Sequence, residues 1–198
     1  HFEQWILGVA DTGKGKLYYP IPRDRDQAMF YSDGLAIKFV SRSLLPFFKG
    51  FRKDIPKINW LNWSARDFDR LFLNDLDWKD WEEVLTEIET TLTDAVLGNA
   101  VNQAPPEVLP VSGPGILEKL KSRRDILKKR AKEYFEFVSE QVNVLGSNQN
   151  EYFKITEAPD KGFRVKVFKR SESSDSASLM YDRVFTVPVT DEVHLYGF

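Results

Sequence analysis

The sequence contains no cysteine and only two histidines in its 198 residues. Without cysteine the chain can form no disulfide bond, no thiolate zinc site and no cysteine nucleophile. The two histidines, His1 and His194, lie at opposite ends of the chain, so the sequence alone suggests no Ser-His-Asp set. Carboxylates are therefore the most promising candidate ligands.

A surplus of one charge and long apolar runs are also missing. The 28 basic and 30 acidic residues give a net charge of −2, whereas a dedicated nucleic-acid-binding domain usually carries a basic surplus. No stretch approaches the roughly 18 consecutive apolar residues of a membrane-spanning helix. We therefore expect no nucleic-acid partner and no membrane insertion by this segment itself.

The apolar content is nevertheless sufficient for a folded core, because 42% of the residues are hydrophobic and 14% are aromatic. The length is typical of one domain, or of one domain with a small appendage. The chain begins at His1 and shows no signal-peptide pattern, so we interpret it as a fragment of a longer precursor.

Residues 1–34 contain short apolar runs separated by turns. Residues 4–9 and 17–22 have the composition of strands, and the glycine-rich residues 11–16 between them predict a β-hairpin. Proline cannot donate a backbone hydrogen bond, so Pro20 and Pro22 confine the second strand to an edge position or to its end.

Residues 35–104 have helical periodicity. Ranges 35–48, 65–73 and 78–92 carry apolar stripes, and Ser64, Asp77 and Thr93 or Asp94 are candidate N-caps. The W-x-x-W pairs Trp60/Trp63 and Trp78/Trp81 favour interhelical packing over an aromatic platform for sugars or bases.

Residues 112–142 predict one long amphipathic helix that starts near Ser112 and Pro114. Its apolar stripe is interrupted at Arg124, and its other face is covered in lysine, arginine and glutamate. The interleaved charges favour a solvated helix face over a phosphate-binding surface.

Residues 143–198 change to the alternating pattern of half-buried strands. Strands are predicted over 152–156, 163–169, 180–187 and 192–196. The side chains expected to need a covering surface are Phe153, Ile155, Val165, Val167, Val184 and Phe185.

The predicted fold class is therefore α+β, with an N-terminal β-hairpin, a helical middle with one long amphipathic helix, and a small C-terminal antiparallel sheet. We expect residues 1–142 to form the hairpin and helical region, and residues 143–198 to form the β region, docked on the helices in one compact unit.

The densest polar motif is Arg23-Asp24-Arg25-Asp26, directly after the second predicted strand. In an extended segment Asp24 and Asp26 share one face, and Arg23 and Arg25 share the other. Two carboxylates on one face can hold a hard cation such as Mg²⁺ or Mn²⁺. The alternative is a salt-bridge ladder in which the arginines neutralise the aspartates, and this pattern favours the ladder.

The stretch Y-P-I-P-R-D-R-D-Q-A-M-F, residues 19–30, resembles a region of large Bacteroidetes envelope proteins. Further matching segments are residues 1–5, 61–70, 92–96, 105–107, 120–125 and 192–198, so the resemblance covers nearly the whole chain. In these proteins the region follows a calcineurin-like metallophosphoesterase domain and precedes an outer-membrane barrel. The resemblance implies a location in the cell envelope, periplasmic or surface-exposed, with neighbouring domains of the same precursor as partners.

A weaker resemblance links I-P-R-D-R-D, residues 21–26, to the catalytic half of atypical kinases of the spore-coat-protein-H type. It implies that Asp24 or Asp26 binds a metal at the nucleotide phosphates, with Arg23 and Arg25 at the phosphates or in ion pairs. Gln4 stands at the second metal position, where the family has asparagine. The catalytic aspartate, the glycine-rich lobe and the phosphate-binding lysine of that family have no counterpart in this chain, and phosphoryl transfer depends on all of them together.

We therefore expect an accessory, non-catalytic module of an envelope-associated, metallophosphoesterase-like protein, with no catalytic residues of its own. Two alternatives remain open. One is a kinase-like half-domain that binds Mg²⁺ and nucleotide phosphates through the Arg-Asp-Arg-Asp motif, and the other is an interaction module without a small-molecule ligand.

Overall fold

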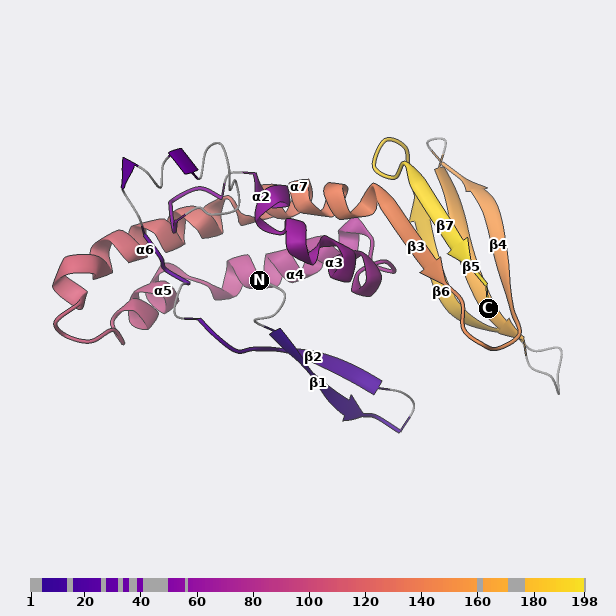
Figure 1. The fold of residues 1–198 in the computed structure, drawn as a ribbon, viewed down its shortest axis with the longest axis horizontal. Helices are drawn as coiled ribbons and strands as arrows, with labels where there is room; N and C mark the ends of the chain where they lie inside the picture. Colours follow the sequence, from indigo (N-terminus) through magenta and orange to yellow (C-terminus); the bar gives the residue numbers. More distant parts are fainter. Residues whose placement is uncertain are drawn as a thin grey trace. The chain divides into compact units, whose positions relative to one another are not determined.

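The structure is a computed structural model that describes residues 5–13, 16–25, 28–31, 34–35, 39–40, 50–55, 57–159, 162–170 and 177–197. It confirms the predicted α+β class, with a two-stranded sheet first, helices in the middle and further strands at the end (Figure 1). The chain divides into two compact units, one comprising 1–65 and 92–126 and the other 66–91 and 127–198.

Unit 1 begins with an antiparallel hairpin of β1 (Trp5–Asp11) and β2 (Lys16–Pro22). The register pairs Trp5 with Pro22 at the open end and Asp11 with Lys16 at the turn. One Asp11 carboxylate oxygen accepts a hydrogen bond of 2.8 Å from the backbone N–H of Gly13, whose φ of 75° lies in the left-handed region that glycine tolerates. The hairpin therefore forms as the glycine-rich turn predicts.

The helices of unit 1 are the short α2 (Ile58–Leu61), the 3₁₀ turn η2 (Trp63–Ala65), α5 (Asp94–Val101) and α6 (Leu109–Asp125). α5 packs on α6. Gly113 of α6 is buried beside Val101 of α5, because its lack of a side chain lets the two helices approach closely. The helix expected over 35–48 lies almost entirely outside the described residues.

Unit 2 contains α3 (Arg66–Phe72), α4 (Trp78–Thr91) and α7 (Leu127–Ser139). α3 and α4 both pack on α7. The Trp78 ring lies 5.5 Å from Phe135 and the Trp81 ring lies 6.4 Å from Tyr134, between centroids. This confirms interhelical packing for the second W-x-x-W pair, whereas Trp60 and Trp63 of unit 1 stack on each other at 5.4 Å.

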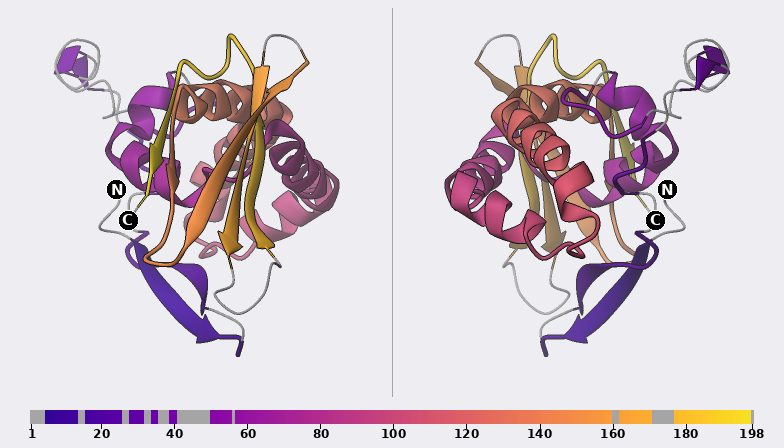
Figure 2. Two further views of the ribbon diagram at one scale, coloured as in Figure 1. Left: turned by 90° about the vertical axis from the view of Figure 1, so that its right-hand side faces the viewer. Right: turned by 90° about the vertical axis from the view of Figure 1, so that its left-hand side faces the viewer.

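The strands of unit 2 are β3 (Gln141–Leu145), β4 (Glu151–Ala158), β5 (Gly162–Arg170), β6 (Ala177–Phe185) and β7 (Glu192–Tyr196). β4, β5 and β6 form the expected antiparallel sheet and lie side by side in Figure 2. β3 and β7 form a separate pair that is parallel, which the sequence did not predict. The core between these strands contains Val142, Val144, Val165, Val167 and Phe185.

The single long helix expected over 112–142 is wrong in three respects. The helix starts at Leu109, since Pro110 occupies the first turn where no backbone donor is needed, and Pro114 lies inside it. It ends at Asp125, and α7 begins at Leu127. Residues 141–145 form β3 instead of a last helical turn, because Val142 and Val144 are buried on one face of a strand. A domain break at 142/143 would fall inside this strand.

Two of the six side chains expected to need cover in the β region are exposed instead. Ile155 and Val184 are 57% and 42% exposed, and Arg183, 5% exposed, occupies the inward position that precedes Phe185. Side chains in a strand alternate between faces, so burying Phe185 also turns Arg183 inward and Val184 outward. In the part of the chain that the structure describes, no helix combines the length and the hydrophobicity needed to cross a bilayer.

Candidate functional site

The predicted site motif lies immediately after β2, on the exposed stretch 23–25. Asp26 and Gln4 lie outside the described residues, so the structure does not test whether Asp24 and Asp26 share a face. The Arg25 guanidinium carbon lies 4.3 Å from the centre of the Trp5 ring, and the Arg25 carbonyl accepts a 3.0 Å hydrogen bond from the Ala28 N–H. The motif is thereby attached to the open end of the hairpin.

The fit of this motif to Mg²⁺ or Mn²⁺ stays a prediction. The described residues supply one of the two carboxylates, Asp24, and it is exposed. Among the described residues there is no group of three histidine, cysteine, aspartate or glutamate side chains placed to hold a metal. A cation held by two exposed carboxylates would be weakly anchored.

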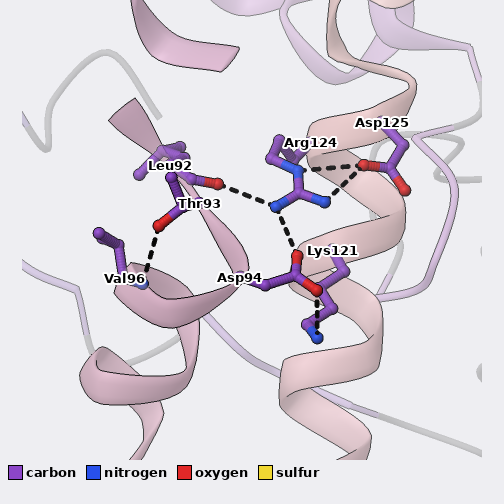
Figure 3. A network of polar contacts seen from close by, with 7 residues as sticks. All are labelled: Leu92, Thr93, Asp94, Val96, Lys121, Arg124 and Asp125. Carbon is purple, nitrogen blue, oxygen red and sulfur yellow. Dashed lines mark hydrogen bonds and ion pairs between the residues drawn. The ribbon is translucent and has the colours of Figure 1, made fainter. Parts of the chain in front are cut away.

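A polar network in unit 1 joins the end of α6 to the start of α5 (Figure 3). Arg124 donates to the Leu92 carbonyl at 2.9 Å and to Asp94 at 2.8 Å, and it also pairs with Asp125. Lys121 donates to the other Asp94 oxygen at 2.7 Å, and the Thr93 hydroxyl caps α5 by accepting from the Val96 N–H at 3.3 Å. Arg124, which interrupts the apolar stripe, thus has a structural role, because its side chain bonds to the start of α5.

The electrostatics of this network favour a structural role over acid–base chemistry. The hydrogen bonds from Lys121 and then Arg124 hold the pKa of Asp94 below its usual range, so this carboxylate stays ionised at neutral pH. Asp94 also lies in the first turn of α5, where the helix dipole stabilises a negative charge.

Other basic side chains of α6 lie over aromatic rings of unit 1. The Lys119 ammonium is 4.2 Å from the centre of the Tyr31 ring, and the Arg123 guanidinium is 4.2 Å from that of Phe51. Arg123 also donates to the Arg52 carbonyl at 2.7 Å. These cations act within the fold, where they cover aromatic surface.

Unit 2 contains a half-buried carboxylate–phenol pair. The Tyr134 hydroxyl of α7 donates to Asp69 of α3 at 2.5 Å. Burial raises the pKa of Asp69 above its ordinary value, and the Tyr134 hydrogen bond opposes part of that shift. Burial, then the hydrogen bond to Asp69, raises the pKa of Tyr134 as well. The pair joins α3 to α7, so burial and this hydrogen bond give both pKa shifts a structural cause.

The raised pKa of Asp69 predicts how the stability of the protein depends on pH. The folded state binds this proton more tightly than the unfolded state does, so Asp69 makes stability fall as the pH rises from the ordinary value near 3.8 through the raised folded pKa. We expect Asp69→Asn, which keeps an acceptor for Tyr134, to remove this dependence and to stay within about 1 kcal/mol of wild type at pH 7. Urea unfolding from about pH 4 to about pH 7 measures the difference.

Asp67→Asn is the matched control, because Asp67 lies in the same helical turn with its side chain 77% exposed. The stability difference between Asp69→Asn and Asp67→Asn should grow in favour of Asp69→Asn as the pH rises. A difference that stays constant, or that shrinks with rising pH, would contradict the assignment.

Arg183 of β6 is a buried cation in unit 2. It donates to the Asn74 carbonyl at 2.6 Å and to the Ser139 hydroxyl at 3.0 Å, and burial lowers its pKa. The Tyr181 hydroxyl donates to the same Asn74 carbonyl at 2.8 Å, and the Asn74 side chain donates to the Asn143 carbonyl at 2.8 Å. The cluster therefore fixes the loop after α3 on the strands.

These contacts join residues far apart in the chain, and of their members the sequence pattern marks only Arg124, as the break in an apolar stripe, and Thr93 or Asp94, as candidate caps. The sequence does contain one signal for a binding surface, namely the run of apolar residues on both strands of the hairpin. Comparison with known proteins adds no assignment: no protein-family model matches the chain, and no curated protein or solved structure is significantly similar to it.

Proposed function

We propose that this chain is an accessory, non-catalytic module whose β1–β2 hairpin binds a protein surface. The observation that carries the proposal is the exposure of the hairpin's apolar side chains. Seven of them are between 44% and 55% exposed, namely Trp5, Ile6, Val9, Leu17, Tyr18, Tyr19 and Ile21. Contiguous apolar surface of this kind marks an interaction site on a folded protein.

Both faces of the hairpin contribute to this surface. Neighbouring residues of a strand point to opposite faces, so Trp5 and Val9 lie on one face and Ile6 on the other. Tyr18 joins the first face opposite Val9, and Ile21 joins the second opposite Ile6. A lone two-stranded hairpin is marginally stable in water, so a partner that covers this surface would also stabilise it.

The charged clusters of the described residues support a non-catalytic role. Asp94 with Arg124, and Asp69 with Tyr134, join one helix to another, and Arg183 joins a loop to a strand. Each has a structural use that accounts for its perturbed pKa. By its resemblance, the proposed context is an envelope-associated, metallophosphoesterase-like protein, periplasmic or surface-exposed, whose neighbouring domains are the partners.

The expected result of a turnover assay is no hydrolysis of p-nitrophenyl phosphate or bis-p-nitrophenyl phosphate and no phosphoryl transfer from labelled ATP, with Mg²⁺, Mn²⁺ or Zn²⁺ present. Such chemistry needs several ligands or charges converging on one point, and removing members of such a set costs orders of magnitude in rate. Turnover that scales with protein concentration and is lost in Asp24→Asn/Asp26→Asn would overturn the proposal and make this motif catalytic.

A further inference from the structure

The two edges of the hairpin differ in their ability to accept another strand. The register places Pro22 opposite Trp5 and Pro20 opposite Leu7, with Tyr18 opposite Val9. Alternate residues of an antiparallel pair direct their backbone groups toward the partner strand or away from it. Prolines are tolerated where no donor is needed, so Pro20 and Pro22 occupy outward-directed positions of β2.

This geometry blocks the outer edge of β2, whereas no proline blocks the outer edge of β1. Two outward positions of β2 lack an N–H group, and proline at an edge prevents pairing with a further strand. In β1 the backbone groups that point outward belong to Trp5, Leu7, Val9 and Asp11. None of these residues is proline. Within the described residues β1 and β2 are the only strands of their sheet.

Charge distribution indicates what pairs with this edge. β1 carries one charge, Asp11, at the turn end, and a cation, Arg25, lies on Trp5 at the other end. An antiparallel strand with the same sequence reverses this order. Asp11 of the second copy then lies beside Trp5 and Arg25 of the first copy, and Arg25 of the second copy lies beside Asp11 of the first. The two aspartates remain about 20 Å apart, since a strand rises about 3.3 Å per residue.

Resting on the proposed role as an interaction module, we propose that two copies of this chain associate by antiparallel pairing of their β1 edges into a four-stranded sheet. Trp5 stands opposite Asp11 of the second copy, and Leu7 stands opposite Val9. These four outward residues form hydrogen-bonded pairs, and opposite side chains share a face. Arg25 then lies beside Asp11 of the second copy, whose carboxylate can accept further hydrogen bonds besides the one from Gly13.

The pairing gives each hairpin the additional strands that a stable sheet needs. Four strands with apolar faces form a sheet of ordinary size, whereas two strands do not. The shared register repeats the arginine–aspartate contact at both ends, as two-fold symmetry requires. Shifting the register by two residues in either direction would separate Arg25 from Asp11, so charge selects one register.

The test is the oligomeric state of the full chain by sedimentation equilibrium. A single strand pair is a small interface, so we expect a reversible monomer–dimer equilibrium near about 100 µM. Val9→Pro removes an outward donor of β1, and we expect it to weaken dimerisation at least about tenfold. Lys16→Pro is the matched control: it stands opposite Asp11 on the edge of β2 already blocked by proline and lies outside the apolar surface, and we expect a change of less than about twofold.

Charge reversal tests the register without placing proline in a strand. Arg25→Glu or Asp11→Arg alone should weaken dimerisation by about threefold to tenfold, because like charges then meet at both ends. The double variant Arg25→Glu/Asp11→Arg should recover most of the wild-type association, because it restores opposite charges. Far-ultraviolet circular dichroism checks that each variant keeps its secondary structure.

Three outcomes would overturn the pairing: a chain that is monomeric throughout the concentration range, a dimer indifferent to Val9→Pro, or a double variant no better than the single ones. Each is separable from failure of the proposed function. A monomer without turnover leaves the module role intact and removes self-pairing, whereas phosphoester turnover removes the module role whatever the oligomeric state.

Discussion

Arg183→Ala is expected to lower the free energy of unfolding by about 2–3 kcal/mol. Arg183 is 5% exposed, and its guanidinium donates to the Asn74 carbonyl and the Ser139 hydroxyl. Its carbon also lies 5.0 Å from the centre of the Phe185 ring. Truncation leaves a cavity beside the core and deprives the buried Ser139 of its partner. Relief from holding a buried cation offsets part of this loss.

Arg164→Ala is the control for this experiment. Arg164 lies on the adjacent strand β5 and pairs with Asp182, but its side chain is 44% exposed. An exposed ion pair contributes about 0–1 kcal/mol, so this variant should stay within about 1 kcal/mol of wild type. Urea unfolding of both variants measures the difference. Equal losses would show that Arg183 contributes no more than a surface arginine.

Gly162→Ala should destabilise the protein by about 2–4 kcal/mol. Gly162 begins β5 and is buried. A Cβ atom there would clash with the Phe185 carbonyl oxygen and would lie 3.1 Å from the Pro159 carbonyl oxygen. Both are backbone atoms, so no side-chain rotation relieves the contact. The β5–β6 pairing would have to shift at Phe185, which is part of the core.

Gly197→Ala provides the matched control, because a Cβ at Gly197 meets no atom within 4 Å. Its effect on stability should be below about 0.5 kcal/mol. Thermal unfolding followed by circular dichroism compares the two variants. A Gly162→Ala variant as stable as Gly197→Ala would mean that the ends of β5 and β6 can shift without a loss of stability.

The sequence correctly predicted two helix caps and the last strand, which depend on residues close together in the chain. Asp77 caps α4, because its carboxylate accepts from the Lys79 N–H at 2.8 Å, and Thr93 caps α5. The last predicted strand coincides with β7. Capping bonds, turn residues and side-chain periodicity all act over a few residues, so the sequence states them directly.

The sequence located only part of the candidate surfaces. It placed a hairpin at the N-terminus and two prolines in its second strand, but not the register that sets Pro20 and Pro22 opposite Leu7 and Trp5. The contact of Arg25 with Trp5 joins the segment after β2 to the first residue of β1, and only the folded strands bring them together. The prediction for Asp24 and Asp26 rests on sequence spacing alone.

The sequence by itself determined the α+β class, the hairpin, the approximate positions of most strands and two helix caps, because each depends on residues close in the chain. Only the tertiary structure decided that 141–145 is a strand, that β3 runs parallel to β7, and that Arg183 faces the core while Val184 faces solvent. In each case the deciding free energy comes from burial against residues of other strands and helices. Val144 reaches complete burial beside β7, and Phe185 forces Arg183 inward. These gains in burial outweigh the local preference of residues 141–145 to continue the helix and the preference of Val184 for a buried position.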